Sequence, residues 1–159
     1  MAEAPRAAAA AIRSAQTARL SLAILLVSAL SVGLPAMLAP RTFYDDFPFL
    51  ASWVDLLPPY NQHLVTDVGG LYLGFAVLFA WALRTLQPTL VRAACSAWLL
   101  AASLHFLFHA THLENFGTAD AVAELASLAF LLVPPLGAIW AVAESAAARS
   151  PEAPPSEPA

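Results

Sequence analysis

The sequence predicts an all-α fold: a polytopic membrane protein built as a four-transmembrane-helix bundle. Of its 159 residues, 60% are hydrophobic and only 11% are charged, whereas a soluble domain is about half apolar and a quarter charged. Four apolar runs are each long enough to cross a hydrocarbon core of about 30 Å as a helix. We expect a membrane domain over residues 20–140, with spans at about 20–38, 64–83, 91–109 and 121–140.

Residues 1–19 form an Ala-rich N-terminal segment that carries three arginines and precedes the first span. The alternative is a cleaved signal peptide, because a basic segment before an apolar run is typical of one. Pro40 follows the small residue Ala39, and a proline at that position disfavours cleavage. We therefore expect a retained helix.

The first loop, residues 40–62, is aromatic, acidic and interrupted by prolines. Its tryptophan, tyrosines and phenylalanines suit the headgroup level of a membrane. The stretch Phe49–Leu57 predicts a short interfacial helix that ends at Pro58-Pro59, because the residue before a proline disfavours helical geometry.

The remaining spans are connected tightly. The link from Arg84 to Arg92 is short, so the second and third spans form an antiparallel hairpin. Pro134-Pro135 predicts a kink in the fourth span. Residues 141–159 are rich in Ala, Pro, Ser and Glu, and we expect a disordered cytoplasmic tail there.

The arginines predict the orientation. Only Arg41 falls in the first loop, while the others flank the opposite ends of the spans: Arg6, Arg13, Arg19, Arg84, Arg92 and Arg149. Because cytoplasmic loops carry the excess of basic residues, both termini are expected in the cytoplasm. Every basic residue is arginine, and alanine is abundant. This composition indicates a GC-rich bacterial genome and hence a bacterial cytoplasmic (inner) membrane.

Ionisable residues gather near one membrane face. In this topology the start of the second span, the end of the third and the start of the fourth meet on the extracytoplasmic side. The third span ends with histidines at i, i+4 and i+7, which share one helix face. Ionisable groups in spans usually face the bundle interior, so we expect one shared volume. Its candidate residues are His63, Asp67, His105, His109, His112 and Glu124.

Imidazoles with carboxylates suit a transition metal such as iron, copper or zinc, and all six residues are candidate metal ligands. A haem would instead use histidines on facing helices, chosen among His63, His105 and His109. No spacing matches a specific metal motif. The leading hypothesis is a metal- or haem-binding membrane protein in a redox-related role. No catalytic residue is assigned, because the sequence does not show the open coordination position that a metalloenzyme needs.

Two alternatives use the same residues. They could form a structural polar cluster in a non-catalytic accessory or assembly subunit, or the site of a small cation- or proton-coupled transporter. The sequence shows no inverted repeat and no evidently broken helix, which argues against transport. With a net charge of -4 there is no surface for nucleic acid. The one cysteine, Cys95, excludes an internal disulfide and is expected to be buried and inert.

Gly70 and Gly74 form a small-xxx-small step that lets another helix approach closely. It could be a homodimer contact or, in the interpretation we favour, tight packing inside the monomer. Trp81, Trp98 and Trp140 are expected to anchor the membrane interface.

The segment His-Leu-Val-Thr-Asp-Val-Gly-Gly-Leu-Tyr-Leu-Gly at 63–74 is followed by an Arg-bounded turn and two more spans. This pattern, over roughly residues 20–140, resembles the DoxX-like superfamily of small four-helix bacterial membrane proteins. The resemblance implies a four-helix bundle. It implies little about function, since the family includes presumed respiratory accessory subunits, whose partners are other membrane subunits, and many members of no known role. The histidines of the third span are not part of the pattern that carries the resemblance.

Overall fold

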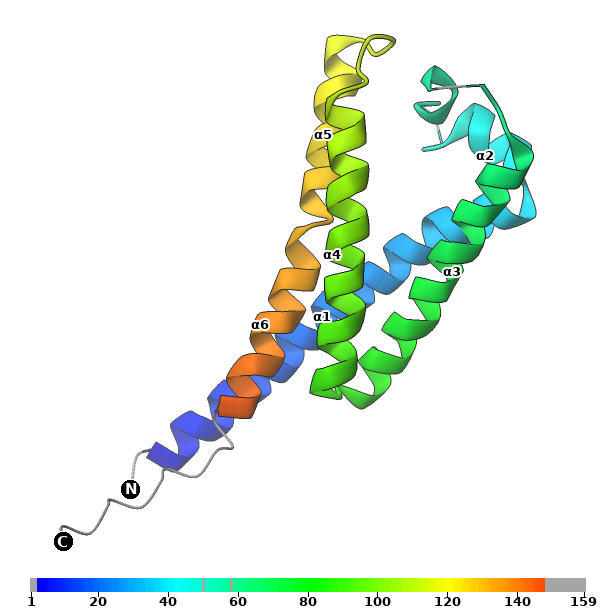
Figure 1. Cartoon of the computed structure of the whole chain (residues 1–159). Coiled ribbons are helices and arrows are strands. Elements are labelled where there is room, and N and C mark those ends of the chain that lie inside the picture. Colours follow the sequence, from blue (N-terminus) through cyan, green and yellow to red (C-terminus); the bar gives the residue numbers. More distant parts are fainter. Residues whose placement is uncertain (1–2, 50, 58, 148–159) are drawn as a thin grey trace, which may run out of the picture.

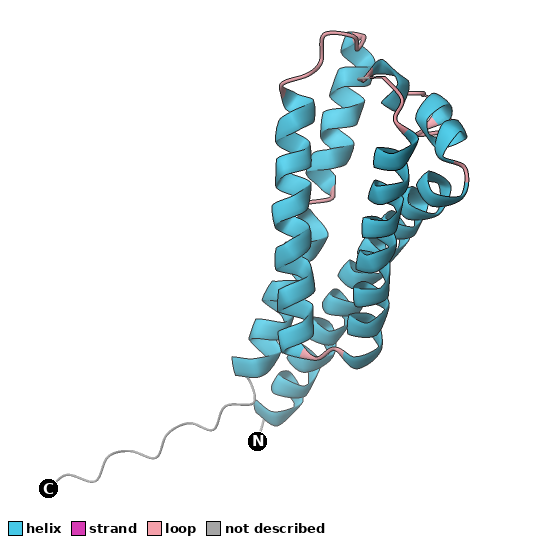
Figure 2. Cartoon of the chain, turned by 45° about the vertical axis from the view of Figure 1, so that its right-hand side comes forward, coloured by secondary structure: helices cyan, strands magenta, loops and turns pink. Residues whose placement is uncertain are grey.

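The computed structural model describes residues 3–49, 51–57 and 59–147, and every regular element within them is helical (Figures 1 and 2). Four segments are long and apolar enough to cross a membrane, which confirms the four-span prediction. The protein is therefore a multi-pass membrane protein in contact with lipid. The elements in order are α1 (Glu3–Leu38), α2 (Pro40–Asp46), the 3₁₀ turn η1 (Val54–Leu56), α3 (Gln62–Thr85), α4 (Pro88–Ala110), α5 (Thr118–Phe130) and α6 (Val133–Ala147).

The bundle has two unlike ends. At one end lie the start of α1, the α3–α4 connection and the end of α6; at the other, which we call the distal end, lie α2 and the α4–α5 connection (Figure 1). Helix α1 packs against α3 and α6, and α4 packs against α6 and α3. Among the described elements, α5 packs only against α4 and α6. The α4–α5 hairpin therefore stands apart from α1, α2 and α3 at the distal end.

The core lies where α1, α3, α4 and α6 meet. Trp98 is only 3% exposed, and its ring packs edge-on against Phe75 and Phe79. The predicted role of Trp98 as an interface anchor is therefore wrong, because α4 directs this ring toward α3. Trp81 and Trp140 are 57% and 60% exposed, as anchors at the membrane surface require.

The fourth span is interrupted. Helix α5 ends at Phe130 and α6 begins at Val133, with Pro134 and Pro135 in its first turn. Prolines lack an N–H and cannot continue the hydrogen bonds of a preceding helix. The buried indole Nε1 of Trp98 donates to the Leu131 carbonyl at 3.4 Å. The predicted kink is confirmed, whereas the expectation that no helix is broken is wrong.

Two helices extend beyond their predicted limits. Helix α1 begins at Glu3, so residues 3–19 of the N-terminal segment are part of the first helix, because alanine is the best helix former. Helix α6 runs to Ala147, so the predicted disorder is wrong for residues 141–147. Ser14 on α1 donates to the Glu144 carboxylate and ties this last part of α6 to α1. The remainder of the predicted tail, 148–159, lies outside the described residues.

The first loop folds differently from the prediction. Its α-helix is α2, which begins with Pro40 in the first turn and contains an ion pair between Arg41 and Asp45 at 2.7 Å. Proline is preorganised for this position because its N–H would be unpaired there in any case. Among the described residues of the predicted helix Phe49–Leu57, only Val54–Leu56 is helical, as a single 3₁₀ turn.

Helix α3 approaches α1 closely through Gly69. A Cβ added there would lie 2.7 Å from the backbone nitrogen of Met37, whereas one added at Gly70 or Gly74 would meet nothing within 4 Å. The favoured interpretation, that Gly70 and Gly74 pack inside the monomer, is therefore wrong. The homodimer contact through these two glycines stays a prediction.

Gly69→Ala is expected to destabilise the monomer by about 1–3 kcal/mol, because backbone of α1 would have to shift. Gly70→Ala is the matched control and should leave stability unchanged or slightly higher, since alanine is the better helix former. Thermal unfolding of the detergent-purified variants, followed by tryptophan fluorescence, measures both. Equal effects at the two positions would contradict the observed α1–α3 contact.

Candidate functional site

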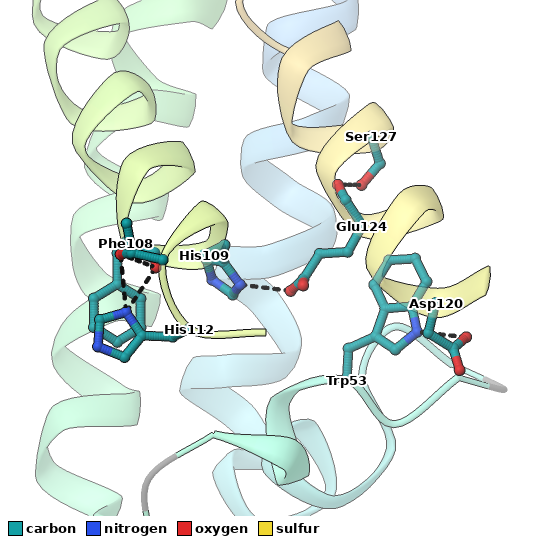
Figure 3. A network of polar contacts seen from close by, with 8 residues as sticks. Trp53, Phe108, His109, His112, Asp120, Glu124 and Ser127 are labelled. Atoms are coloured by element: carbon teal, nitrogen blue, oxygen red, sulfur yellow. Dashed lines mark hydrogen bonds and ion pairs between the residues drawn. The ribbon is translucent and has the colours of Figure 1, made fainter. Parts of the chain in front are cut away.

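His109 and Glu124 form a buried imidazole–carboxyl pair between two membrane-spanning segments. His109 Nδ1 lies 2.5 Å from Glu124 Oε1, and the two side chains are only 7% and 5% exposed (Figure 3). His109 belongs to the last turn of α4 and Glu124 to the second turn of α5. Ionisable groups inside a span are costly and commonly mark functional sites, so this pair is the principal candidate.

The α4–α5 hairpin brings the pair together. Helix α4 ends at Ala110, and α5 begins at Thr118 after the N-cap residue Gly117. Because the two helices run in opposite directions and pack together, the end of one faces the beginning of the other. The contact is therefore local in the chain, although the two residues stand on separate helices.

The pair is incompletely satisfied. Within the described residues, the buried Glu124 Oε2 has no hydrogen-bond partner. His109 Nδ1 also makes no hydrogen bond of regular geometry, although it lies 2.5 Å from Oε1. The carboxylate oxygen therefore lies close to Nδ1 but out of line with the ring N–H direction. A buried polar atom without a partner costs about 1–3 kcal/mol, so this arrangement calls for an explanation other than stability.

The other histidines of α4 have different surroundings. The His105 ring lies 4.5 Å, centroid to centroid, from that of His109, and its side chain is exposed. The exposed His112 stacks on Phe108 and points away from Glu124 (Figure 3). Its Nδ1 lies 2.8 Å from the Phe108 carbonyl oxygen, so Nδ1 carries the proton that is donated. His105 is thus the histidine that adjoins the pair.

The predicted residues of α3 form a separate pair. His63 Nε2 lies 3.4 Å from Asp67 Oδ2, and these side chains are 80% and 56% exposed. At about 100° per residue, His63 and Asp67 lie about 120° and 160° around the helix from Gly69, which faces α1. The close α1–α3 contact therefore turns this pair outward.

The expectation of one shared volume for all six residues is wrong. In the part of the chain that the structure describes, no three His, Cys, Asp or Glu side chains come together in a way that could hold a metal ion. Each pair supplies two ligands, whereas zinc sites use at least three protein ligands. The transition-metal and haem hypotheses stay predictions.

Two hydrogen bonds near the pair could not be predicted from sequence spacing. Trp53 Nε1 donates to Asp120 Oδ1 at 3.1 Å (Figure 3), and Asn115 Nδ2 donates to the Leu56 carbonyl at 2.9 Å. Both join the first loop to the α4–α5 hairpin. The one signal in the sequence was the four-residue spacing of Asp120 and Glu124, which places them on one face of α5.

No family model, curated protein or solved structure matches the chain. The resemblance to the DoxX-like superfamily therefore stays a prediction. The site has to be interpreted from its own geometry.

His109→Ala is expected to destabilise the protein by about 3–5 kcal/mol, because it leaves the Glu124 carboxylate buried and unpaired. The double variant His109→Leu with Glu124→Leu should recover most of this loss, since it removes both polar groups. His63→Ala is the control and should change stability by less than about 1 kcal/mol, because its pair is exposed. Unfolding of the purified variants in detergent measures all three, and a harmless His109→Ala would contradict the buried pair.

Proposed function

We propose that this protein is a small proton-coupled membrane transporter in which His109 and Glu124 form the proton-binding site. The observation that carries the proposal is the 2.5 Å contact between these two buried side chains within spanning helices. The buried Oε2 of Glu124 has no hydrogen-bond partner among the described residues, which supports a site that gains and loses a proton during function.

An imidazole and a carboxylate in contact can share one proton, and histidine is the side chain that ordinarily titrates near neutral pH. In a low-dielectric interior, a change of charge on such a pair strongly changes the stability of the helix packing around it. The other titratable groups in the distal part of the α4–α5 hairpin are His105, His112, Glu114 and Asp120. Of these, His105 adjoins the pair and could pass a proton to or from it.

The interrupted fourth span also supports transport. Discontinuous helices are typical of transporters, in which one part of the bundle moves against another around the binding site. The break lies between α5, which carries Glu124, and α6, which packs against α1. Since α5 makes no contact with α1, α2 or α3 among the described elements, α5 could rock against them.

The orientation is part of the proposal. The distribution of arginines places both termini in the cytoplasm, and hence the distal end on the extracytoplasmic side of a bacterial inner membrane. Protons would then reach the pair from outside the cell.

A second candidate function is binding of a transition metal such as iron, copper or zinc. The observation that favours it is the proximity of the His105 ring to the His109–Glu124 pair, which would supply three ligands if the ring turned. Elemental analysis of the detergent-purified protein distinguishes the two. A near-stoichiometric metal that is lost in His105→Ala but kept in His63→Ala would favour metal binding over proton coupling.

Glu124→Gln is expected to abolish proton-coupled solute movement, because a neutral amide cannot take up the proton. The test uses proteoliposomes with an internal pH-sensitive dye, an imposed pH gradient, and a panel of cations, amines, amino acids and sugars. The wild type should move protons when one of these solutes is added, and Glu124→Gln should be at least tenfold slower.

Asp67→Asn is the matched control, since it neutralises an exposed carboxylate at the same end of the bundle. It should retain most of the wild-type rate. No solute-dependent proton movement in the wild type, or equal rates in all three proteins, would refute the proposed function.

A further inference from the structure

We infer that residues 51–57, which we call the distal strap, form the gate on the aqueous route to the His109–Glu124 pair, with Trp53 as its closing side chain. This inference rests on the proposed function for its purpose, because a proton site needs controlled access to water. It deepens that function by assigning how access to the site is regulated.

The strap lies directly beyond the pair. Trp53 Nε1 donates to Asp120 Oδ1 at 3.1 Å. Asp120 precedes Glu124 by one helical turn on nearly the same face of α5, so it lies on the distal side of the carboxylate. Figure 3 shows the Trp53 indole beside Asp120 at this side of Glu124. The largest side chain of the strap therefore occupies the approach to the pair from the distal end.

A second hydrogen bond holds the strap to the hairpin. Asn115 Nδ2, in the α4–α5 connection, donates to the Leu56 carbonyl at 2.9 Å. Among the described elements, α5 itself has no packing contact with α1, α2 or α3. These hydrogen bonds thus link two parts of the bundle that are otherwise apart at the distal end, and both are exposed.

The backbone of the strap is also suited to hold Trp53 in place. Ser52, immediately before it, has a φ of 54°, in the left-handed region that residues with a side chain rarely adopt. Such conformations persist where the surrounding structure determines them, and they cluster at ligand clamps and switch regions. The polar links are few and solvent-exposed, so the strap can open without unfolding the core at the other end.

The position of the pair makes a cover necessary. His109 is one residue before the last residue of α4, and Glu124 lies in the second turn of α5. Near helix ends at a membrane surface, both groups would be hydrated unless something covered them. They are instead more than nine-tenths buried, while the neighbouring His112 and Asp120 are exposed.

The test measures access to the pair directly. Glu124→Cys is reacted in detergent with a charged, water-soluble thiol reagent, and the wild type, whose only cysteine is the fully buried Cys95, gives the background rate. Reaction should be slow with the strap intact. Adding Trp53→Ala should raise the rate at least tenfold. Trp53→Phe, which keeps a ring but loses the N–H donor, should give an intermediate rate.

Trp140→Ala is the matched control, because Trp140 is an exposed tryptophan on α6, remote from the strap. It should leave the labelling rate unchanged. If Glu124→Cys does not fold, the same comparison at His109→Cys decides. An unchanged rate in Trp53→Ala, or an equal rise in Trp140→Ala, overturns the gate.

The outcome is independent of the transport assay. Fast labelling in Trp53→Ala without any proton movement would support the gate and refute the proton-coupled function. Unchanged labelling together with loss of transport in Glu124→Gln would refute the gate and keep the function.

Discussion

The absence of water in the hydrocarbon core constrains this structure more than any single contact. Every backbone N–H and C=O inside lipid has to be paired within the protein, so the spans are helices and a break in one of them requires a donor from elsewhere. The break after α5 meets this requirement through the indole of Trp98, which donates to the freed carbonyl of Leu131. The burial of Trp98 in the core thus also stabilises the one irregular part of a spanning segment.

The close packing of α1 against α3 and α6 determines which part of the bundle is loosely packed. Gly69 brings the backbones of α1 and α3 into contact near the distal end, and α6 packs against α1 near the chain termini. Helix α5, beyond the break, is left with α4 and α6 as its only packing partners among the described elements. The part of the bundle with the fewest packing contacts therefore contains Glu124, and it is joined to the first loop by hydrogen bonds. Low-stability regions of this kind are where moving elements of proteins are found.

The fold was largely predictable from the sequence, because hydrophobic run length in lipid is a strong and local signal. The kink at Pro134-Pro135 was predictable for the same reason, since proline acts through its own geometry. Contacts between helices were not predictable, because they depend on helix rotation. Gly69 and Gly70 are adjacent in the chain, yet one touches α1 and the other meets nothing. The rotation of α3 that directs Gly69 toward α1 also turns His63 and Asp67 outward. The rotations of α4 and α5 instead bury His109 and Glu124 against each other.

The comparison of these two pairs shows why chemistry alone did not identify the site. Both consist of an imidazole and a carboxyl group at the same end of the bundle, so residue type does not distinguish them. An exposed pair contributes about 0–1 kcal/mol, because water screens its charges and solvates either residue alone. A buried pair loses about 3–5 kcal/mol when one member is removed, because nothing else compensates the remaining group. The protonation state of His109 and Glu124 is therefore coupled to the packing of α4 on α5, whereas that of His63 and Asp67, which lie on one helix, is not coupled to a contact between helices. Of the two pairs, only the buried one joins two helices, which is the property that the proposed proton coupling requires.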